Sequence, residues 1–244
     1  QEPDGYLQTL YTIAGIPRWS NKADHEGYNA GYFIEAALAH YLLTNGQDTR
    51  LYDAAKRLAD CWCRHIGPAP KKSWYEGHQE LEQALARLAR FVEEKEGAGQ
   101  GQKYLALAKF ITDCRGGGEE YDQSHLPVIQ QYEAVGHAVR AVYSYAGMAE
   151  IAMATGDVDY HSAVKSLWGS IVHRKYYVTG GVGSGETSEG FGPEFSLPHH
   201  AYCESCAGCG ELFFQHKMLL AYQEAKYADL YEETLYNAIL GGLD

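Results

Sequence analysis

Residues 137–156, HAVRAVYSYAGMAEIAMATG, carry the pattern that decides the fold. Apolar side chains recur with helical periodicity along this stretch, which predicts a long α-helix. Gly136 precedes the stretch, a Thr-Gly-Asp turn ends it, and a second helical stretch follows at 159–175. The sequence therefore predicts a helical hairpin in this part of the chain.

The same hairpin pattern recurs along the chain. Further pairs of helical stretches are predicted at 32–46 with 50–66, at 78–91 with 102–115, and at about 206–222 with 226–243. Four hairpins of this kind are typical of an all-α repeat, which buries its apolar faces by stacking in an open solenoid or a closed ring. The clearest strand-like run is short, Tyr176–Thr179.

Three of the hairpins open on a glycine followed by a ring side chain. These ring residues are Tyr32, His78 and His137. A closed ring of hairpins would place the starts of one helix set around a common cleft. We therefore expect these three side chains to point at one site, although a histidine at a helix start is also a common cap or core residue.

Composition limits the class of protein. The chain has 244 residues, with 20 Lys and Arg against 32 Asp and Glu, and the net charge of −12 argues against a nucleic-acid partner. No apolar run approaches the ~20 residues of a membrane span. No signal peptide is visible, and a chain that opens on Gln1 and stops at Asp244 within a helical pattern is expected to be a fragment.

Two long segments interrupt the hairpins, at 115–135 and 178–205. Loops of this length in compact domains are usually functional or disordered. The second segment contains most of the chemically versatile side chains. They are Glu186, Glu189, Glu194, His199, His200, Cys203 and Glu204, with Cys206 and Cys209 directly after them.

The three clustered cysteines leave several interpretations open. Thiolate, imidazole and carboxylate groups suit zinc, and His199, His200 or Glu204 would supply a fourth ligand. An iron–sulfur site would need a fourth cysteine. Small buried residues at a helix start are the plain structural alternative.

Cys206 is the strongest candidate for a metal-bound thiolate. A position near a helix N-terminus is expected to lower the pKa of its thiol. Glu204 lies two residues away, and two side chains at this spacing do not face each other in a regular helix. We therefore expect the helix to begin after both residues if they share a metal.

The acids of the second segment suit glycoside hydrolysis, although acids in a loop are usually only solvated. That reaction commonly needs one group to protonate the leaving oxygen and a second to act as nucleophile or base. The aromatic content of 13% also suits a sugar-binding cleft, as well as an apolar core.

Several long stretches resemble one known family, the zinc-dependent β-L-arabinofuranosidases of glycoside hydrolase family 127 and their relatives. The matching stretches are QEPDGYL (1–7), GYFIEAALAHY (31–41), YEGHQELEQAL (75–85), YDQSHLPVIQQYEAVGHAVRAVYSYAGMAEIA (121–152), YVTGGVGS (177–184), SEGFGPEFSLPHHAYCESCA (188–207) and YADLYEETLYNAILGGL (227–243). The resemblance implies an (α/α)6 barrel, of which residues 1–244 would be part of a single catalytic domain with both ends truncated. It also implies retaining hydrolysis of β-linked L-arabinofuranose, with a zinc-bound cysteine nucleophile that lies beyond this chain.

The resemblance also implies a role for particular residues. Glu189 matches the glutamate of the family's E-x-F-G segment, the general acid/base, and Glu194 is the second choice for that role. The zinc ligands of the family match Glu204 and Cys206. The sugar-binding side chains would be Tyr32, His78 and His137. Tyr32 stands where the best-known members carry a histidine, so a related sugar is an alternative substrate.

Two other functions are compatible with the residues. One is a non-catalytic carbohydrate-binding member of the same fold, because a fold does not fix a function. The other is an α/α-toroid lyase or epimerase that uses a His/Tyr pair drawn from Tyr32, His78 and His137. A homodimer and a cytoplasmic location are expected; removal of a leader would make the location periplasmic or secreted.

Overall fold

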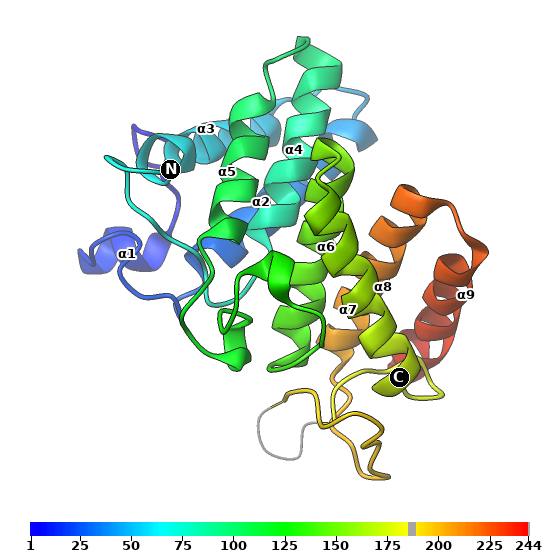
Figure 1. Cartoon of the computed structure of the whole chain (residues 1–244). Helices are drawn as coiled ribbons and strands as arrows, with labels where there is room; N and C mark the ends of the chain where they lie inside the picture. Colours follow the sequence, from blue (N-terminus) through cyan, green and yellow to red (C-terminus); the bar gives the residue numbers. More distant parts are fainter. Residues whose placement is uncertain (185–188, 244) are drawn as a thin grey trace. The chain divides into compact units, whose positions relative to one another are not determined.

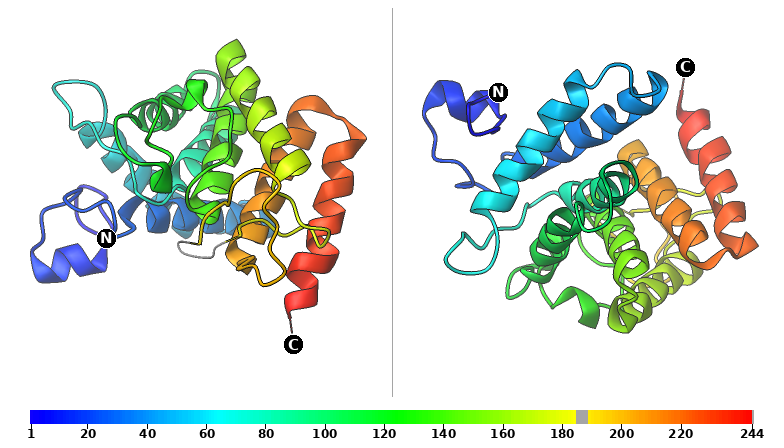
Figure 2. Two further views of the ribbon diagram at one scale, coloured as in Figure 1. Left: turned by 60° about the horizontal axis from the view of Figure 1, so that its bottom comes forward. Right: turned by 90° about the horizontal axis from the view of Figure 1, so that it is seen from above.

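The computed structural model describes residues 1–184 and 189–243 and contains two compact units, Gln1–Cys114 and Arg115–Asp244. Figures 1 and 2 trace the chain through both units. Within the described residues the regular structure is helical, and the only β-contacts are isolated bridges.

The first unit contains a short N-terminal helix, followed in the sequence by two helical hairpins. Helix α2 pairs with α3, α4 pairs with α5, and α2 also packs against α4. The helices are α1 (Thr9–Ala14), α2 (Glu26–Leu43), α3 (Arg50–His65), α4 (Leu81–Glu96) and α5 (Gln102–Asp113).

Close packing in the first unit depends on a glycine. A Cβ atom on Gly31 of α2 would lie 2.7 Å from Cγ of Glu80 and 3.0 Å from the nitrogen of Leu81. Glycine therefore lets α2 approach the start of α4 more closely than any other residue would. Gly31 and Tyr32, which the sequence predicts at a helix start, lie inside α2, where Gly31 makes a helix-packing contact.

The second unit is built around α6 (Ala138–Thr155), which packs against both α7 (Val158–Arg174) and α8 (Ser205–Tyr222). Helix α9 (Ala225–Thr234) lies beside α8 (Figure 2) and continues through short π and 3₁₀ turns to Gly242. Two 3₁₀ turns, Glu120–Asp122 and Val128–Gln130, precede α6.

Helix α6 is buried on nearly all sides. Every residue from Ala138 to Ala152 except Arg140 is buried. Such a helix belongs in the interior of a layered fold. The helix also carries an ion pair in the interior, because Glu150 accepts from the ammonium of Lys217 on α8 at 2.7 Å.

The four predicted hairpins are confirmed: α2 with α3, α4 with α5, α6 with α7, and α8 with α9. The predicted strand at 176–179 is wrong, because Tyr176 makes a single antiparallel bridge to Val182 and the segment turns at Gly180. None of the helices that the structure describes is long and apolar enough to cross a membrane.

The predicted equivalence of the three ring residues is also wrong. Only His137 caps a helix, where its ring accepts from the backbone N–H of Arg140. Tyr32 lies inside α2, and His78 lies three residues before α4 begins at Leu81.

Candidate active site

The segment after α7 pairs with the start of α6 through a short antiparallel contact. His137 and Gly190 form an isolated bridge, in which the Ala138 N–H donates to the Glu189 carbonyl at 3.0 Å. The Phe191 N–H donates to the Gly136 carbonyl at 2.9 Å. This pairing places the Glu189 side chain beside the N-terminus of α6.

His137 and Glu189 form the central contact of the site. Nε2 of His137 lies 3.0 Å from Oε2 of Glu189. Because Nδ1 of His137 accepts from the Arg140 N–H at 3.4 Å, we assign the ring proton to Nε2, which donates to Glu189. The ring therefore fixes the orientation of the carboxylate.

The two partners differ in exposure. The side chain of His137 is 8% exposed and that of Glu189 is 49% exposed. Burial, and then the nearby positive charge of Arg140, lower the pKa of His137 below its ordinary value. A buried imidazole thus contacts a carboxyl group that is open to solvent.

Glu204 lies next to this pair. One ligand atom from each of His137, Glu189 and Glu204 fits within 4.8 Å of the others. Glu204 is the N-cap residue of α8, and Cys206 lies in the first turn. His137, Glu189 and Glu204 therefore come together from two segments, the start of α6 and residues 189–204.

Glu204 and Cys206 interact although the helix begins between them, so the expectation that it begins after both is wrong. A cap residue lies half outside the helix, and its carboxylate reaches the first turn. The hydrogen bond to Glu204, followed by burial, raises the pKa of the Cys206 thiol to about 11. The expected lowering by the helix N-terminus is therefore also wrong, because the adjacent carboxylate outweighs it.

These residues fit a zinc ion. Carboxylate, thiolate and imidazole are the donors that zinc prefers, and a cation next to the carboxylate favours loss of the thiol proton. Cys203 and Cys209, which the sequence left as alternative ligands, have other surroundings. Cys203 Sγ donates to the Gly183 carbonyl at 3.3 Å, and burial raises the pKa of both thiols. His199 and His200 pack against each other with ring centroids 4.9 Å apart.

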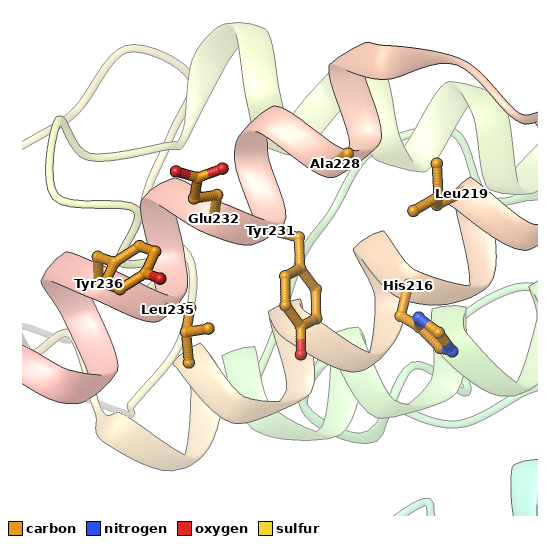
Figure 3. Close-up of a pocket in the computed structure, with 7 residues that line it drawn as sticks. All are labelled: His216, Leu219, Ala228, Tyr231, Glu232, Leu235 and Tyr236. Atoms are coloured by element: carbon orange, nitrogen blue, oxygen red, sulfur yellow. The ribbon is translucent and has the colours of Figure 1, made fainter.

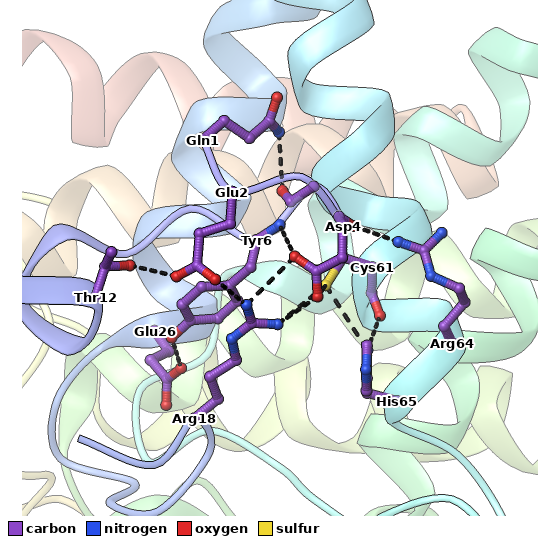
Figure 4. A network of polar contacts seen from close by, with 11 residues as sticks. Gln1, Glu2, Asp4, Tyr6, Thr12, Arg18, Glu26, Cys61, Arg64 and His65 are labelled. Atoms are coloured by element: carbon purple, nitrogen blue, oxygen red, sulfur yellow. Dashed lines mark hydrogen bonds and ion pairs between the residues drawn. The ribbon is translucent and has the colours of Figure 1, made fainter. Parts of the chain in front are cut away.

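A second group of metal-type side chains, Asp4, Cys61 and His65, lies in the first unit and is compatible with zinc in its donor types (Figure 4). The guanidinium of Arg18 already supplies positive charge there. It pairs with Asp4 at 2.5 Å and lies 3.9 Å from Cys61 Sγ. The hydrogen bond from Arg18 lowers the pKa of Asp4 to about 2, and burial raises the pKa of Cys61 to about 11. We interpret this group as an ion-pair network.

Glu194, the second candidate for the acid/base, has a different partner. Its carboxylate is ion-paired with Arg174 at the end of α7. The next residue, Phe195, donates its backbone N–H to the Arg174 carbonyl at 2.8 Å. These contacts anchor the loop and favour Glu189 for the chemical role. Glu186 lies outside the described residues.

Tyr32 and His78 belong to an aromatic cluster in the first unit. Tyr28 packs edge-on against both, with ring centroids 4.9 Å from Tyr32 and 4.6 Å from His78. His25 completes the cluster, 5.6 Å from the rings of Tyr28 and His78. Sequence reasoning missed His25 and Tyr28; the spacing of four residues between Tyr28 and Tyr32 was the available signal.

Half-exposed rings of this kind suit a sugar face. His137 belongs to the second unit, and its meeting with Tyr32 and His78 at one sugar stays a prediction.

A pocket of about 440 Å³ in the second unit lies apart from the predicted residues (Figure 3). It lies between α8 and α9, and the predicted site residues do not line it. The lining residues are His216, Leu219, Ala228, Tyr231, Glu232, Leu235 and Tyr236.

The helical hairpins define an all-α domain of stacked helix pairs, and the comparisons with known proteins identify its family. The sequence model described as "Beta-L-arabinofuranosidase, GH127 catalytic domain" matches residues 1–244. The chain belongs to glycoside hydrolase family 127.

One relative is the non-reducing end β-L-arabinofuranosidase of Bifidobacterium longum subsp. longum, 33% identical over all of this chain and 40% of the relative. Two solved structures are similar over the whole chain. One is a GH127 β-arabinofuranosidase, with 43% identity and a TM-score of 0.91 over 39% of that protein. The other is a GH127 β-L-arabinofuranosidase from Geobacillus stearothermophilus T6, with 37% identity and a TM-score of 0.92 over 41% of that protein.

The chain thus spans about two fifths of the length of these relatives. The GH127 structures are (α/α)6 barrels, and this chain matches part of that fold. The predicted fold class is therefore confirmed.

Proposed function

We propose that the intact protein is a retaining glycosidase that releases L-arabinofuranose, or a closely related sugar, from β-linked glycans. The hydrogen bond between His137 and Glu189, beside Glu204, is the observation that carries the proposal. Membership of GH127 and the activity named for the relatives support the choice of substrate. Residues 1–244 would be part of one catalytic domain.

Glu189 would act twice. As a carboxylic acid it donates its proton to the glycosidic oxygen while the bond from C1 to that oxygen breaks. A cysteine sulfur outside residues 1–244 forms the new bond to C1. Glu189, now a carboxylate, takes a proton from water as the water oxygen displaces sulfur at C1. Two displacements at C1 give retention.

Glu204 and Cys206 would hold the zinc ion. When bound, zinc supplies positive charge that keeps a cysteine sulfur in its thiolate form. The proposal assigns to His137 the orientation of Glu189, and to Tyr32 and His78 contacts with the sugar. The proximity of Cys206 to Glu204 supports the ligand pair.

An assay of the intact protein tests the proposal. The substrate is an aryl β-L-arabinofuranoside, with α-L-arabinofuranoside and β-D-galactofuranoside analogues as comparisons. We expect release from the β-L-arabinofuranoside, loss of release after treatment with a chelator, and recovery with added zinc. Binding of the sugar without hydrolysis would support the carbohydrate-binding alternative, and elimination or inversion of a sugar carbon would support a lyase or epimerase.

A further inference from the structure

Gln123 occupies an unusual position for a residue of its size. It follows the 3₁₀ turn Glu120–Asp122 with a left-handed backbone, φ of 58°, where glycine is the ordinary residue. Its side chain is 0% exposed. A long polar side chain in such a conformation suggests that its carboxamide has a role.

The carboxamide reaches across to the residues that flank His137. Nε2 donates to the carbonyl of Val135 at 3.0 Å and to the carbonyl of His137 itself at 3.3 Å. An amide NH₂ group has two protons, which are shared here among four carbonyl oxygens within 3.5 Å. The carbonyls of Glu120 and Tyr121 lie further away, at 3.4 and 3.5 Å.

The same turn contacts His137 in two other ways. The backbone N–H of His137 donates to the Tyr121 carbonyl at 3.2 Å. The rings of Tyr121 and His137 pack perpendicular to each other with centroids 5.3 Å apart.

Gly136, with φ of 74°, permits this approach, because a Cβ there would lie 1.8 Å from the Glu120 oxygen. The backbone of residue 137 is therefore held between Gln123 on one side and the Glu189–Phe191 segment on the other.

We propose that Gln123 is a positioning residue for the acid/base: its buried carboxamide fixes the backbone on both sides of His137 and so sets the imidazole against Glu189. The kinetic part of this inference rests on the proposed function. Gln123 does not act on the substrate.

The chain offers a matched control. Gln131 is a second buried carboxamide in the same loop, and its Nε2 donates to the carbonyls of Gln123 and Leu126, both at 2.8 Å. These two donor contacts of Gln131 lie within the loop and not on the segment 135–137. Gln131→Met removes a buried amide of the same kind.

The kinetic test compares Gln123→Met, Gln123→Glu and Gln131→Met in the intact protein with two β-L-arabinofuranosides. One has an aryl leaving group that departs without a proton, and the other has an alkyl leaving group that needs one. We expect Gln123→Met to lower kcat/KM, which reports the first displacement, by about 10- to 100-fold for the alkyl substrate and by less than about 3-fold for the aryl substrate. Gln123→Glu, which keeps the shape and one donor when protonated, should lie between wild type and Gln123→Met.

A purely structural role predicts a different pattern, in which kcat/KM falls by the same factor for both substrates. Equal losses, no loss, or the same substrate-dependent loss in Gln131→Met would overturn the proposal. If Gln123→Met does not fold, the ratio of the two losses in Gln123→Glu decides the question.

A second readout does not depend on activity. In a crystal structure of Gln123→Met we expect the distance from His137 Nε2 to Glu189 Oε2 to exceed hydrogen-bond length, whereas Gln131→Met keeps it. An unchanged distance in Gln123→Met contradicts the proposal even if the protein cleaves no arabinofuranoside. Failure of the wild type to cleave any of the sugars, with the distance changed as expected, counts against the proposed function alone.

Discussion

The imidazole Nε2 of His137 lies 3.0 Å from the carboxylate Oε2 of Glu189, although 52 residues separate the two in the sequence. The contact is made because the segment after α7 returns to the start of α6 and pairs with it at Gly190. A buried ring thus contacts a half-exposed acid, an arrangement compatible with the acid/base role proposed for Glu189.

Replacement of Glu189 by Gln should remove most activity. The amide keeps the size of the side chain but cannot supply or accept the proton, so kcat for an alkyl β-L-arabinofuranoside should fall by about 10²- to 10⁴-fold. An aryl substrate should lose less in the first step. Steady-state kinetics of the intact protein with both substrates measures this difference.

Glu194→Gln is the matched control for Glu189→Gln. Glu194 lies in the same segment, but its carboxylate pairs with Arg174 at the surface. We expect a change in kcat of less than about 3-fold, because exposed ion pairs contribute only about 0–1 kcal/mol to stability. If Glu194→Gln abolishes turnover while Glu189→Gln preserves it, the two assignments are exchanged.

Zinc content should depend on Glu204 and Cys206. Replacement of Cys206 by Ser removes a soft ligand, and the zinc bound per intact protein chain should fall from near one toward zero after dialysis. Elemental analysis of the purified protein measures the content directly. Thermal stability of the wild type should also fall when a chelator removes the metal, because a ligand of the folded state stabilises it.

Cys61→Ser tests whether the other metal-type group holds the ion. Arg18 already pairs with Asp4 in that group, so we expect the zinc content to stay the same in this variant. Loss of zinc in Cys61→Ser, with full zinc in Cys206→Ser, would move the metal site to the first unit.

Tyr32 should contribute to sugar affinity. Tyr32 is 37% exposed, and its ring packs on Tyr28 with centroids 4.9 Å apart, so part of the residue is open to solvent. A ring contact contributes about 0.5–1.5 kcal/mol, so Tyr32→Ala should raise KM by about 2- to 10-fold. Tyr32→Phe, which keeps the ring, should stay closer to wild type.

Tyr41, on the same helix, provides the comparison for Tyr32. Its ring packs against Tyr52 and Phe91, both at 5.2 Å, and takes no part in the cluster around His78. Tyr41→Ala should lower thermal stability with KM unchanged. An equal rise in KM for both variants would show that Tyr32 acts through stability alone.

Glu211 on α8 should make the stability of the second unit depend on pH. The side chain is 0% exposed, and burial raises its pKa from 4.5 to about 7. The folded protein therefore holds a proton that the unfolded chain releases between about pH 4.5 and 7. Stability from this group is complete below pH 4.5 and is lost as the pH rises through about 7.

Glu211→Gln removes the titration. At pH 8 we expect the variant to unfold with a free energy on the order of 3 kcal/mol higher than wild type, and at pH 4.5 with nearly the same free energy. Urea unfolding at both pH values measures the difference. Glu232→Gln, at an exposed carboxyl on α9, should follow the wild type. If the free energies of unfolding of the wild type and of Glu211→Gln differ by the same amount at both pH values, the assignment is contradicted.

The sequence predicted the helices well because the apolar residues of each helical stretch recur along it and turn residues end it, although α6 itself is buried on nearly all sides. The predicted strand at 176–179 is wrong because its β-branched and aromatic residues have no partner strand and form only a single bridge. The prediction of a helix start at Gly31 is also wrong. That glycine is needed where α2 meets α4, a tertiary contact that leaves no local signal.

The candidate site was predictable in its residue types but not in its pairing. Glu189 and Glu194 lie in one segment with similar neighbours, and the contact of Glu194 with Arg174 is long-range. The thiol of Cys206 was expected to ionise at a helix N-terminus, an argument that left out the adjacent carboxylate of Glu204. The role of Gln123 depends on the path of the loop in space.

The anomeric form of the first product tests the central claim most directly. Proton NMR of the intact, zinc-loaded protein with an aryl β-L-arabinofuranoside records the sugar before it mutarotates. We predict that β-L-arabinofuranose appears first and that the α form follows at the uncatalysed rate. First appearance of the α form would contradict the retaining mechanism, and no release of arabinose would contradict the proposed activity.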